Sequence, residues 1–170
     1  MEGLLQRPHP AVAPGTGLLR KDQFQVAYVT NDLDRACKVY SERYGLGDYA
    51  FIEGKMASGG DIRVAFAWVG PTMYEIIDAR GPGTSFYNER LPTDNFAIRF
   101  HHLGFLIHDR KSWQAVECEF KEGGWRIAFE TFNDGFMDAI YVEAPELGHY
   151  LEYIYAYEAG LQFFHSVPVS

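Results

Sequence analysis

Four polar residues recur in this chain at a regular spacing, and their side chains are of the types that hold a divalent metal ion. Gln25 lies 50 residues before Glu75, and His102 lies 50 residues before Glu152. The second pair follows the first by 77 residues, so the arrangement is duplicated. Amide, carboxylate and imidazole donors together suit Zn, Ni, Co, Mn, Mg or Fe, and the residue types do not choose among them. We therefore expect one metal site built from two equivalent halves.

A metal ion at such a site would polarise a substrate carbonyl and acidify the C–H bond beside it. Glu152 and Glu75 are then the candidate catalytic residues, because a carboxylate near that carbon can act as the general base. Two glutamates on opposite sides of a small, partly apolar substrate would serve an isomerase, an epimerase or a lyase. Taken singly, a strand Glu is more often a solvated surface residue, so the hypothesis depends on all four residues being in register.

Three further residues are candidates for substrate binding. Tyr150 precedes Glu152 by two residues and therefore shares its strand face; it would either hydrogen-bond a substrate or simply pack. Phe163 and Phe164 lie near the C-terminus and would either cover the cleft or only hold the terminus in place.

The sequence around the four polar residues repeats as well. Residues 24–29 (FQVAYV) align with residues 101–106 (HHLGFL), and residues 74–77 (YEII) align with residues 151–154 (LEYI). Seven residues after Gln25 and after His102 an aspartate follows, in the position of a helix N-cap. A repeat of this kind indicates a duplicated structural unit.

Each unit is predicted to contain one strand, one helix and three more strands. The first comprises a strand at 23–30, a helix at 33–44 and strands at 49–54, 62–69 and 73–79. The second comprises a strand at 99–107, a helix at 110–122 and strands at 125–131, 138–144 and 149–156. This pattern predicts an α+β fold of two tandem βαβββ modules, which form an open β-barrel cleft with the helices on the outside.

Alternation along the strands predicts which side chains face the cleft. The four candidate ligands would point inward, whereas Phe24, Val26 and Tyr28 would face the helices. His101 would lie toward the helix side or the interface between the modules. The expected division of the chain is an N-terminal arm at 1–20, modules at 21–80 and 99–157, a linker at 81–98 and a C-terminal helix and tail at 158–170.

Composition excludes several classes of function. The formal charge of −8 argues against binding nucleic acid through its backbone, which needs clustered Lys and Arg. The sequence has no apolar run long enough to cross a bilayer, and its first residues do not resemble a secretory signal. The two cysteines do not suggest a disulfide scaffold, so we expect a cytoplasmic protein without a membrane partner.

Four segments of the chain resemble the vicinal oxygen chelate superfamily, which includes glyoxalase I, methylmalonyl-CoA epimerase, extradiol dioxygenases and bleomycin-resistance proteins. They are VAYVTNDLDRACKVYSERYGL, MYEIIDARGPGTSFYNERL, FHHLGFLIHD and GHYLEYIY. The resemblance covers about residues 22–156 and implies paired βαβββ modules around a metal. The family's ligand positions fall on Gln25, Glu75, His102 and Glu152, a set similar to that of animal-type glyoxalase I.

The resemblance leaves three functions open. A glyoxalase-like isomerase, epimerase or lyase agrees with the ligand set. An extradiol-type ring-cleavage dioxygenase would use Fe and a His, His, Glu set, which Gln25 and Glu75 do not match. A metal-free binding or resistance protein would hold its ligand by aromatic stacking. Related proteins also assemble modules across a dimer, so a homodimer is expected.

Overall fold

The computed structural model describes residues 17–170, so residues 1–16 of the expected N-terminal arm lie outside the described part. The first module contains β1 (Asp22–Thr30), α1 (Leu33–Tyr44), β2 (Ala50–Lys55), β3 (Asp61–Val69) and β4 (Thr72–Arg80). The second contains β5 (Ile98–Leu106), α3 (Arg110–Gly123), β6 (Ile127–Asn133), β7 (Met137–Ala144) and β8 (His149–Ala156). The short helix α2 (Ser85–Asn88) lies in the linker, and α4 (Glu158–Ser166) follows the second module.

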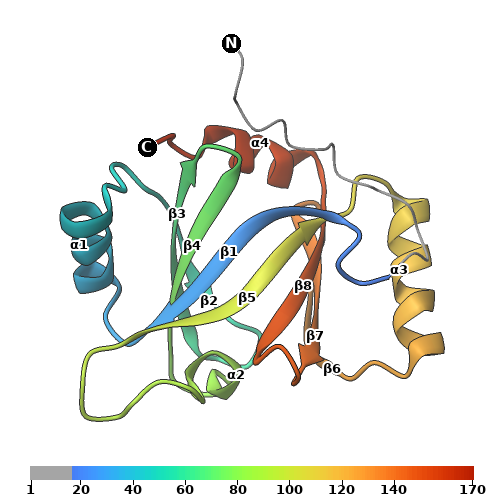
Figure 1. Cartoon of the computed structure of the whole chain (residues 1–170), viewed down its shortest axis with the longest axis horizontal. Coiled ribbons are helices and arrows are strands. Elements are labelled where there is room, and N and C mark those ends of the chain that lie inside the picture. Colours follow the sequence, from blue (N-terminus) through green and yellow to red (C-terminus); the bar gives the residue numbers. More distant parts are fainter. Residues whose placement is uncertain (1–16) are drawn as a thin grey trace, which may run out of the picture.

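All eight strands form one curled sheet in the order β2-β3-β4-β1-β5-β8-β7-β6. Within each module the first strand pairs parallel with the last, β1 with β4 and β5 with β8, whereas β1 pairs antiparallel with β5. The helices α1 and α3 stand outside the sheet at opposite ends of the molecule (Figure 1). The predicted fold of two βαβββ modules with external helices is therefore confirmed.

Both outer helices begin and end at the residues that the sequence indicates. The Asp32 carboxylate accepts a hydrogen bond from Arg35 N at 3.0 Å, and the Asp109 carboxylate accepts one from Ser112 N at 2.8 Å. Gly45 and Gly124 end the helices in the left-handed conformation, which glycine adopts without steric cost. The repeat thus includes the helix caps, which fix where each helix leaves its sheet.

Strand β6 begins two residues later than expected. β6 covers Ile127–Asn133, whereas the sequence pattern predicted 125–131. The amide of Trp125 donates to the carbonyl of Phe120 at 3.0 Å, so this residue still belongs to the end of α3. The strand can start only after that turn is complete.

Burial divides the molecule into one inner and two outer layers of side chains. Leu33, Ala36 and Tyr40 of α1 pack on Ala65 and Ile76 of the sheet. Under α3 the corresponding cluster includes Trp113, Val116 and Phe120, and Leu18 joins it from the segment before β1. The inner cluster lines the concave side and includes Val64, Phe66, Met73, Ile77 and Ile154.

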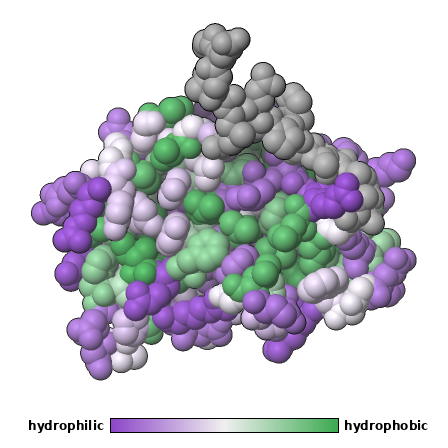
Figure 2. All heavy atoms as spheres, viewed as in Figure 1, coloured by the Kyte–Doolittle hydropathy of each residue, from purple (hydrophilic) through white to green (hydrophobic). Residues whose placement is uncertain are grey.

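The outer face of the central strands also carries apolar groups. In the view of Figure 1, hydrophobic residues gather over the middle of the sheet and hydrophilic residues over α1 and α3 (Figure 2). Val26, Tyr28, Phe100 and Leu103 are half-buried on these strands.

None of the helices among residues 17–170 is both long and apolar enough to cross a membrane. The expected homodimer stays a prediction.

Two β-bulges interrupt the pairing of β1 with β5 and change the direction of two side chains. The register skips Phe24 on β1 and His101 on β5, and these two positions are equivalent in the repeat. A bulge adds one residue to a strand and breaks the strict alternation of faces. Phe24 consequently packs in the inner cluster, and the prediction that it faces the helices was wrong.

Replacing the N-cap of α1 tests the predicted helix start. Asp32→Ala removes the acceptor for Arg35 N, so we expect the free energy of unfolding to fall by about 1 kcal/mol. Asp32→Asn keeps a capping oxygen and should cost much less. Urea unfolding followed by circular dichroism gives both values, and equal losses for the two variants would contradict the role of the cap.

Candidate metal centre

The four predicted ligands lie in two rows that cross the middle of the sheet. In one row Glu75 of β4 is paired with Ala27 of β1, which is paired with His102 of β5. In the other row Gln25 of β1 is paired with Gly104 of β5, which is paired with Glu152 of β8. Residues 27 and 104 are equivalent in the repeat, so the two rows are related by the same symmetry as the modules.

Small residues at the centre of each row leave room for the longer side chains. A Cβ atom added to Gly104 would lie 2.8 Å from Gln25 Cβ and 2.7 Å from Gln25 Oε1, closer than real Cβ contacts. The glycine therefore lets the Gln25 side chain lie across β5. Ala27 occupies the equivalent position in the other row and is fully buried.

Three of the four side chains bring their donor atoms together. The donor atoms of Glu75, His102 and Glu152 all lie within 4.8 Å of one another. His102 Nε2 is 3.2 Å from Glu75 Oε2 and 2.9 Å from Glu152 Oε2, but these contacts do not have hydrogen-bond geometry. Gln25 Oε1 is likewise buried without a hydrogen-bond partner. Among the described residues, these four atoms are the only buried side-chain nitrogen and oxygen atoms left unsatisfied.

A chain of hydrogen bonds fixes the orientation of His102. His101 Nε2 lies 3.1 Å from the carbonyl oxygen of Phe86, which can only accept, so this nitrogen carries a proton. Burial, followed by the charge of His102, lowers the pKa of His101 to about 3, so His101 is neutral and its Nδ1 is an acceptor. The Nδ1–H of His102 therefore donates to it across 2.8 Å. His102 thus points its Nε2 atom at the two carboxylates.

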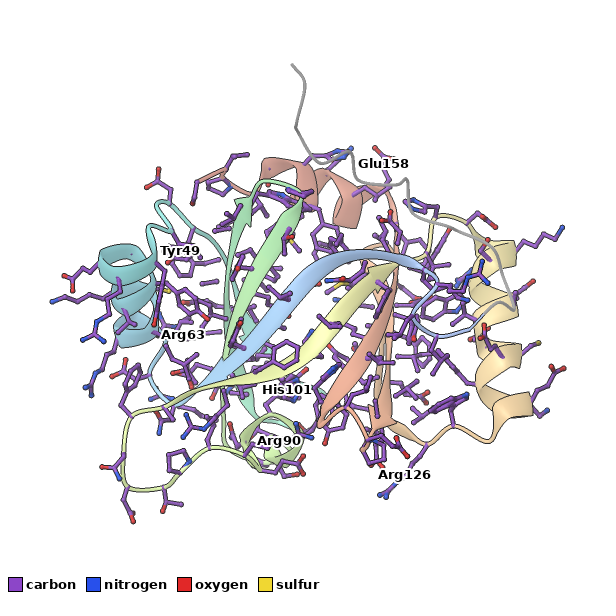
Figure 3. All side chains as sticks on the ribbon, in the orientation of Figure 1. Tyr49, Arg63, Arg90, His101, Arg126 and Glu158 are labelled. Carbon is purple, nitrogen blue, oxygen red and sulfur yellow. The ribbon has the colours of Figure 1, made fainter. Side chains whose placement is uncertain are left out.

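The position of His101 follows from the bulge described above. Because the bulge breaks the alternation on β5, the His101 side chain lies on the same side as that of His102 and approaches α2. There it packs against Phe86, with the two ring centroids 4.8 Å apart. In Figure 3 its side chain lies between β5 and α2, near the centre of the molecule. The linker thus supports the site through His101, a link that strand alternation does not predict.

The charges at the site favour a bound cation. Burial raises the pKa of Glu75, and His102 opposes this shift. For His102, burial alone would lower the pKa, but Glu152 and Glu75 outweigh it and raise the pKa to about 9. Two buried carboxylates therefore draw positive charge to this point. A divalent ion can replace the His102 proton and satisfy the clustered donor atoms of Glu75, His102 and Glu152, with Gln25 Oε1 as a further unpaired atom, so the donor set fits a metal.

The site forms the base of a large cavity on the concave side of the sheet. The cavity has a volume of ≈ 800 Å³, and Gln25, Glu75 and Glu152 reach it while His102 lies behind them. Its exposed lining residues belong to the end of β2 with the turn after it, and to the hairpin of β6 and β7. A substrate entering between these two edges would meet the carboxylates at the far end.

Two tyrosines that the sequence did not single out also line this cavity. Tyr141 is the cross-strand partner of Glu152, and Tyr87 comes from α2. Burial, and then the charge of Glu152 among its neighbours, raises the pKa of Tyr141 well above its usual range. Burial and the charges of Glu75 and Glu152 do the same for Tyr87. Both hydroxyls are therefore protonated donors beside the carboxylates.

The three residues expected to bind substrate occupy different places. Phe164 lines the cavity, whereas the Phe163 ring packs on Phe66 with ring centroids 5.2 Å apart. Tyr150 does not reach the cavity, because its hydroxyl donates to Glu89 Oε1 at 2.5 Å and its ring packs on Phe86. Of these three predicted contacts, the structure places only Phe164 where a ligand would lie.

Comparison with solved structures identifies the fold. A hypothetical protein from Bacillus halodurans C-125 matches with a TM-score of 0.61 at 14% identity, over 81% of this chain and 96% of that chain. A methylmalonyl-CoA epimerase in complex with methylmalonyl-CoA and NH4+ gives a TM-score of 0.59 at 13% identity, over 82% and 96% of the chains. The chain has the vicinal oxygen chelate fold.

A further solved structure matches this protein over most of its length. Methylmalonyl-CoA epimerase from Mycobacterium tuberculosis matches with a TM-score of 0.58 at 16% identity, over 87% of this chain and 95% of that chain. No protein-family model and no curated protein matches in sequence. At these identities the vicinal oxygen chelate fold is shared, and the chemistry must be argued from the residues of this chain.

Gly104→Ala should weaken metal binding without unfolding the protein. The added methyl group would displace the Gln25 side chain, so we expect the affinity for a divalent ion to fall by about tenfold or more. Gly54→Ala is the matched control, since a Cβ there meets nothing within 4 Å. Competition with a fluorescent chelator measures the affinity. Unchanged binding in Gly104→Ala would contradict a role for Gln25.

His101→Phe should weaken metal binding through His102. The variant removes the acceptor for the His102 Nδ1–H, and loss of such a supporting contact typically lowers metal affinity by about 10- to 100-fold. His101→Asn keeps an acceptor oxygen and should bind more tightly than His101→Phe. Equal affinities for the two variants, both with native thermal stability, would show that the hydrogen bond does not support the site.

Proposed function

We propose that this chain is a divalent-metal-dependent enzyme that transfers a proton at the carbon next to a substrate carbonyl. One observation carries the proposal, namely four buried polar atoms without hydrogen-bond partners at the base of a cavity. Buried polar groups are nearly always paired, so a group of unpaired polar atoms at the base of one cavity calls for a ligand. Gln25, Glu75, His102 and Glu152 would hold the ion.

The residues around the ion supply groups that can move a proton. A bound divalent ion would polarise the carbonyl and acidify the adjacent C–H bond. Glu75 and Glu152 come from opposite sides of the β1–β5 pair, so each can take or return a proton at one face of the carbon. The raised pKa of Glu75 brings it closer to the range of an efficient general base. Tyr141 beside Glu152 supplies a protonated hydroxyl to the substrate oxygen.

This arrangement supports an isomerase, an epimerase or a lyase of the glyoxalase I type. The epimerases that share the fold act on methylmalonyl-CoA, and an epimerase changes the configuration at one carbon. That agreement concerns the type of reaction, and the coenzyme A thioester itself is not part of the proposal. A ring-cleavage dioxygenase is the rival that also needs a metal, and a binding protein is the rival that needs none.

Elemental analysis of the purified protein tests the metal site. We expect about one equivalent of a divalent ion per chain, lost in Glu152→Ala because the variant removes a charged ligand. Glu143→Ala is the matched control, since Glu143 lies on β7 and pairs with Arg126 instead of facing the cavity. No metal in the wild type after each of Zn, Ni, Co, Mn, Mg and Fe has been offered would overturn the proposal.

Deuterium exchange tests the proton transfer separately. The metal-loaded protein in D2O should speed the exchange of the CH2 protons of 2-hydroxyacetophenone, a ketone with two neighbouring oxygens, as followed by NMR. Chelator-treated protein should not. Tyr141→Phe should keep the metal but slow the exchange. Bound Fe with oxygen consumption on catechols, and no exchange, would favour the dioxygenase instead.

A further inference from the structure

The wall of the cavity differs in chemistry from its base. Polar atoms are gathered at the base, where Gln25, Glu75 and Glu152 lie. Above them the wall is hydrocarbon and aromatic, with side chains such as Val64, Phe66, Ile77, Phe129, Ile154 and Phe164. A volume of ≈ 800 Å³ is that of a site for a drug-sized molecule. The cavity therefore has room for an occupant much larger than the group that reacts.

The charges on the lining are almost all negative. Among the lining residues the charged ones are one lysine, Lys55, and four glutamates, Glu53, Glu75, Glu130 and Glu152. Glu75 and Glu152 belong to the base. At the mouth, Lys55 pairs with Asp61 at 2.5 Å and Glu53 pairs with Arg63 at 2.8 Å, which leaves Glu130 as the exposed lining glutamate that has no ion pair with any residue from 17 to 170.

The arginines of this region are directed elsewhere. Arg63 lies on the side of α1, where it also pairs with Asp34 at 3.2 Å. Arg126 pairs with Glu143, and Arg90 lies over the Tyr150 ring at 5.0 Å. Figure 3 shows Arg63 beside α1, Arg90 by α2 and Arg126 at the lower edge of the molecule. Within residues 17–170, no cationic side chain other than Lys55 lines the cavity.

We propose that this cavity takes an uncharged, largely aromatic molecule whose oxygen-bearing end points at the four polar residues, an assignment that rests on the proposed function. Burying an ionised group in a hydrocarbon wall without a partner is strongly unfavourable, and this wall offers none. Aromatic rings gain from packing against Phe66, Phe129 and Phe164. Substrates that carry phosphate or carboxylate groups along their length are excluded, because they need Lys and Arg partners.

Two dyes that differ by one charge test this assignment. N-phenyl-1-naphthylamine is neutral, and 8-anilino-1-naphthalenesulfonate is the same skeleton with a sulfonate. Both become fluorescent in apolar surroundings. We expect the neutral dye to bind at least about tenfold more tightly at low ionic strength, with or without metal. Equal affinities, or no binding of the neutral dye, would overturn the proposal.

Two variants that each replace a glutamate by a lysine show whether the charge at the mouth of the cavity affects dye binding. Glu130→Lys should strengthen binding of the sulfonate dye by about two- to fivefold, less at high salt, and leave the neutral dye unchanged. Glu117→Lys on the exposed surface of α3 is the matched control and should change neither. An equal effect of both variants would show that the dye senses only net charge, against the proposal.

A third variant tests whether the neutral dye lies in the cavity. Ala139→Phe adds an aromatic ring to the wall of the cavity and should weaken binding of the neutral dye. Circular dichroism checks that the variant is folded. Unchanged affinity in the folded variant would place the dye elsewhere and overturn the assignment. Dye binding does not require the metal. Binding of the neutral dye without binding of any ion would therefore contradict only the proposed function.

Discussion

Strands β1 and β5 pair antiparallel along the middle of the sheet, and this pairing joins the two modules. It places Ala27 beside His102 and Gln25 beside Gly104, so both rows of polar residues depend on its register. A shift by one residue would turn these side chains to the other face of the sheet. The bulges at Phe24 and His101 hold the register in place, because an additional residue on each strand permits few other alignments. The same β1–β5 hydrogen bonds therefore determine both the position of the polar residues and the joining of the two modules.

The buried carboxylates make this centre sensitive to what occupies it. Glu75, Glu152 and His102 are almost fully enclosed, so the charges of the carboxylates are compensated only by a proton or by an ion at the same point. The linker helix α2 covers the site from one side, where its Tyr87 lines the cavity next to the carboxylates. Asn88 Nδ2 holds this helix to the carbonyl of Ala79 at 2.8 Å. Enclosure of this kind strengthens each electrostatic contact inside the site.

Most of the architecture could be predicted from the sequence because it depends on short-range sequence patterns. Aspartate caps and alternating strands each act within a few residues, and the repeat provides each of these patterns in a second copy. The inward direction of the four polar side chains could be predicted for the same reason. The metal itself stays a prediction, since no sequence pattern shows that an ion is bound.

What the sequence did not predict depends on contacts between distant segments. His101 faces His102 only because of a bulge, and Tyr87 reaches the cavity only because the linker folds under the sheet. Tyr141 could have been found, since it shares a strand face with other inner residues and lies opposite Glu152. Tyr150 shares the strand face of Glu152, but its ring packs on Phe86 and does not line the cavity, so its role in substrate binding stays a prediction.

The equivalence of Gln25 and His102 has a consequence for how such a centre can evolve. In a symmetric assembly of single-module chains, any substitution in one half of the site appears in the other half as well. Here the two halves are encoded separately, so an amide occupies one first strand and an imidazole the other. Each side of a bound molecule can therefore be adapted on its own, and a pocket with two identical halves related by a two-fold rotation can become one whose halves recognise different groups.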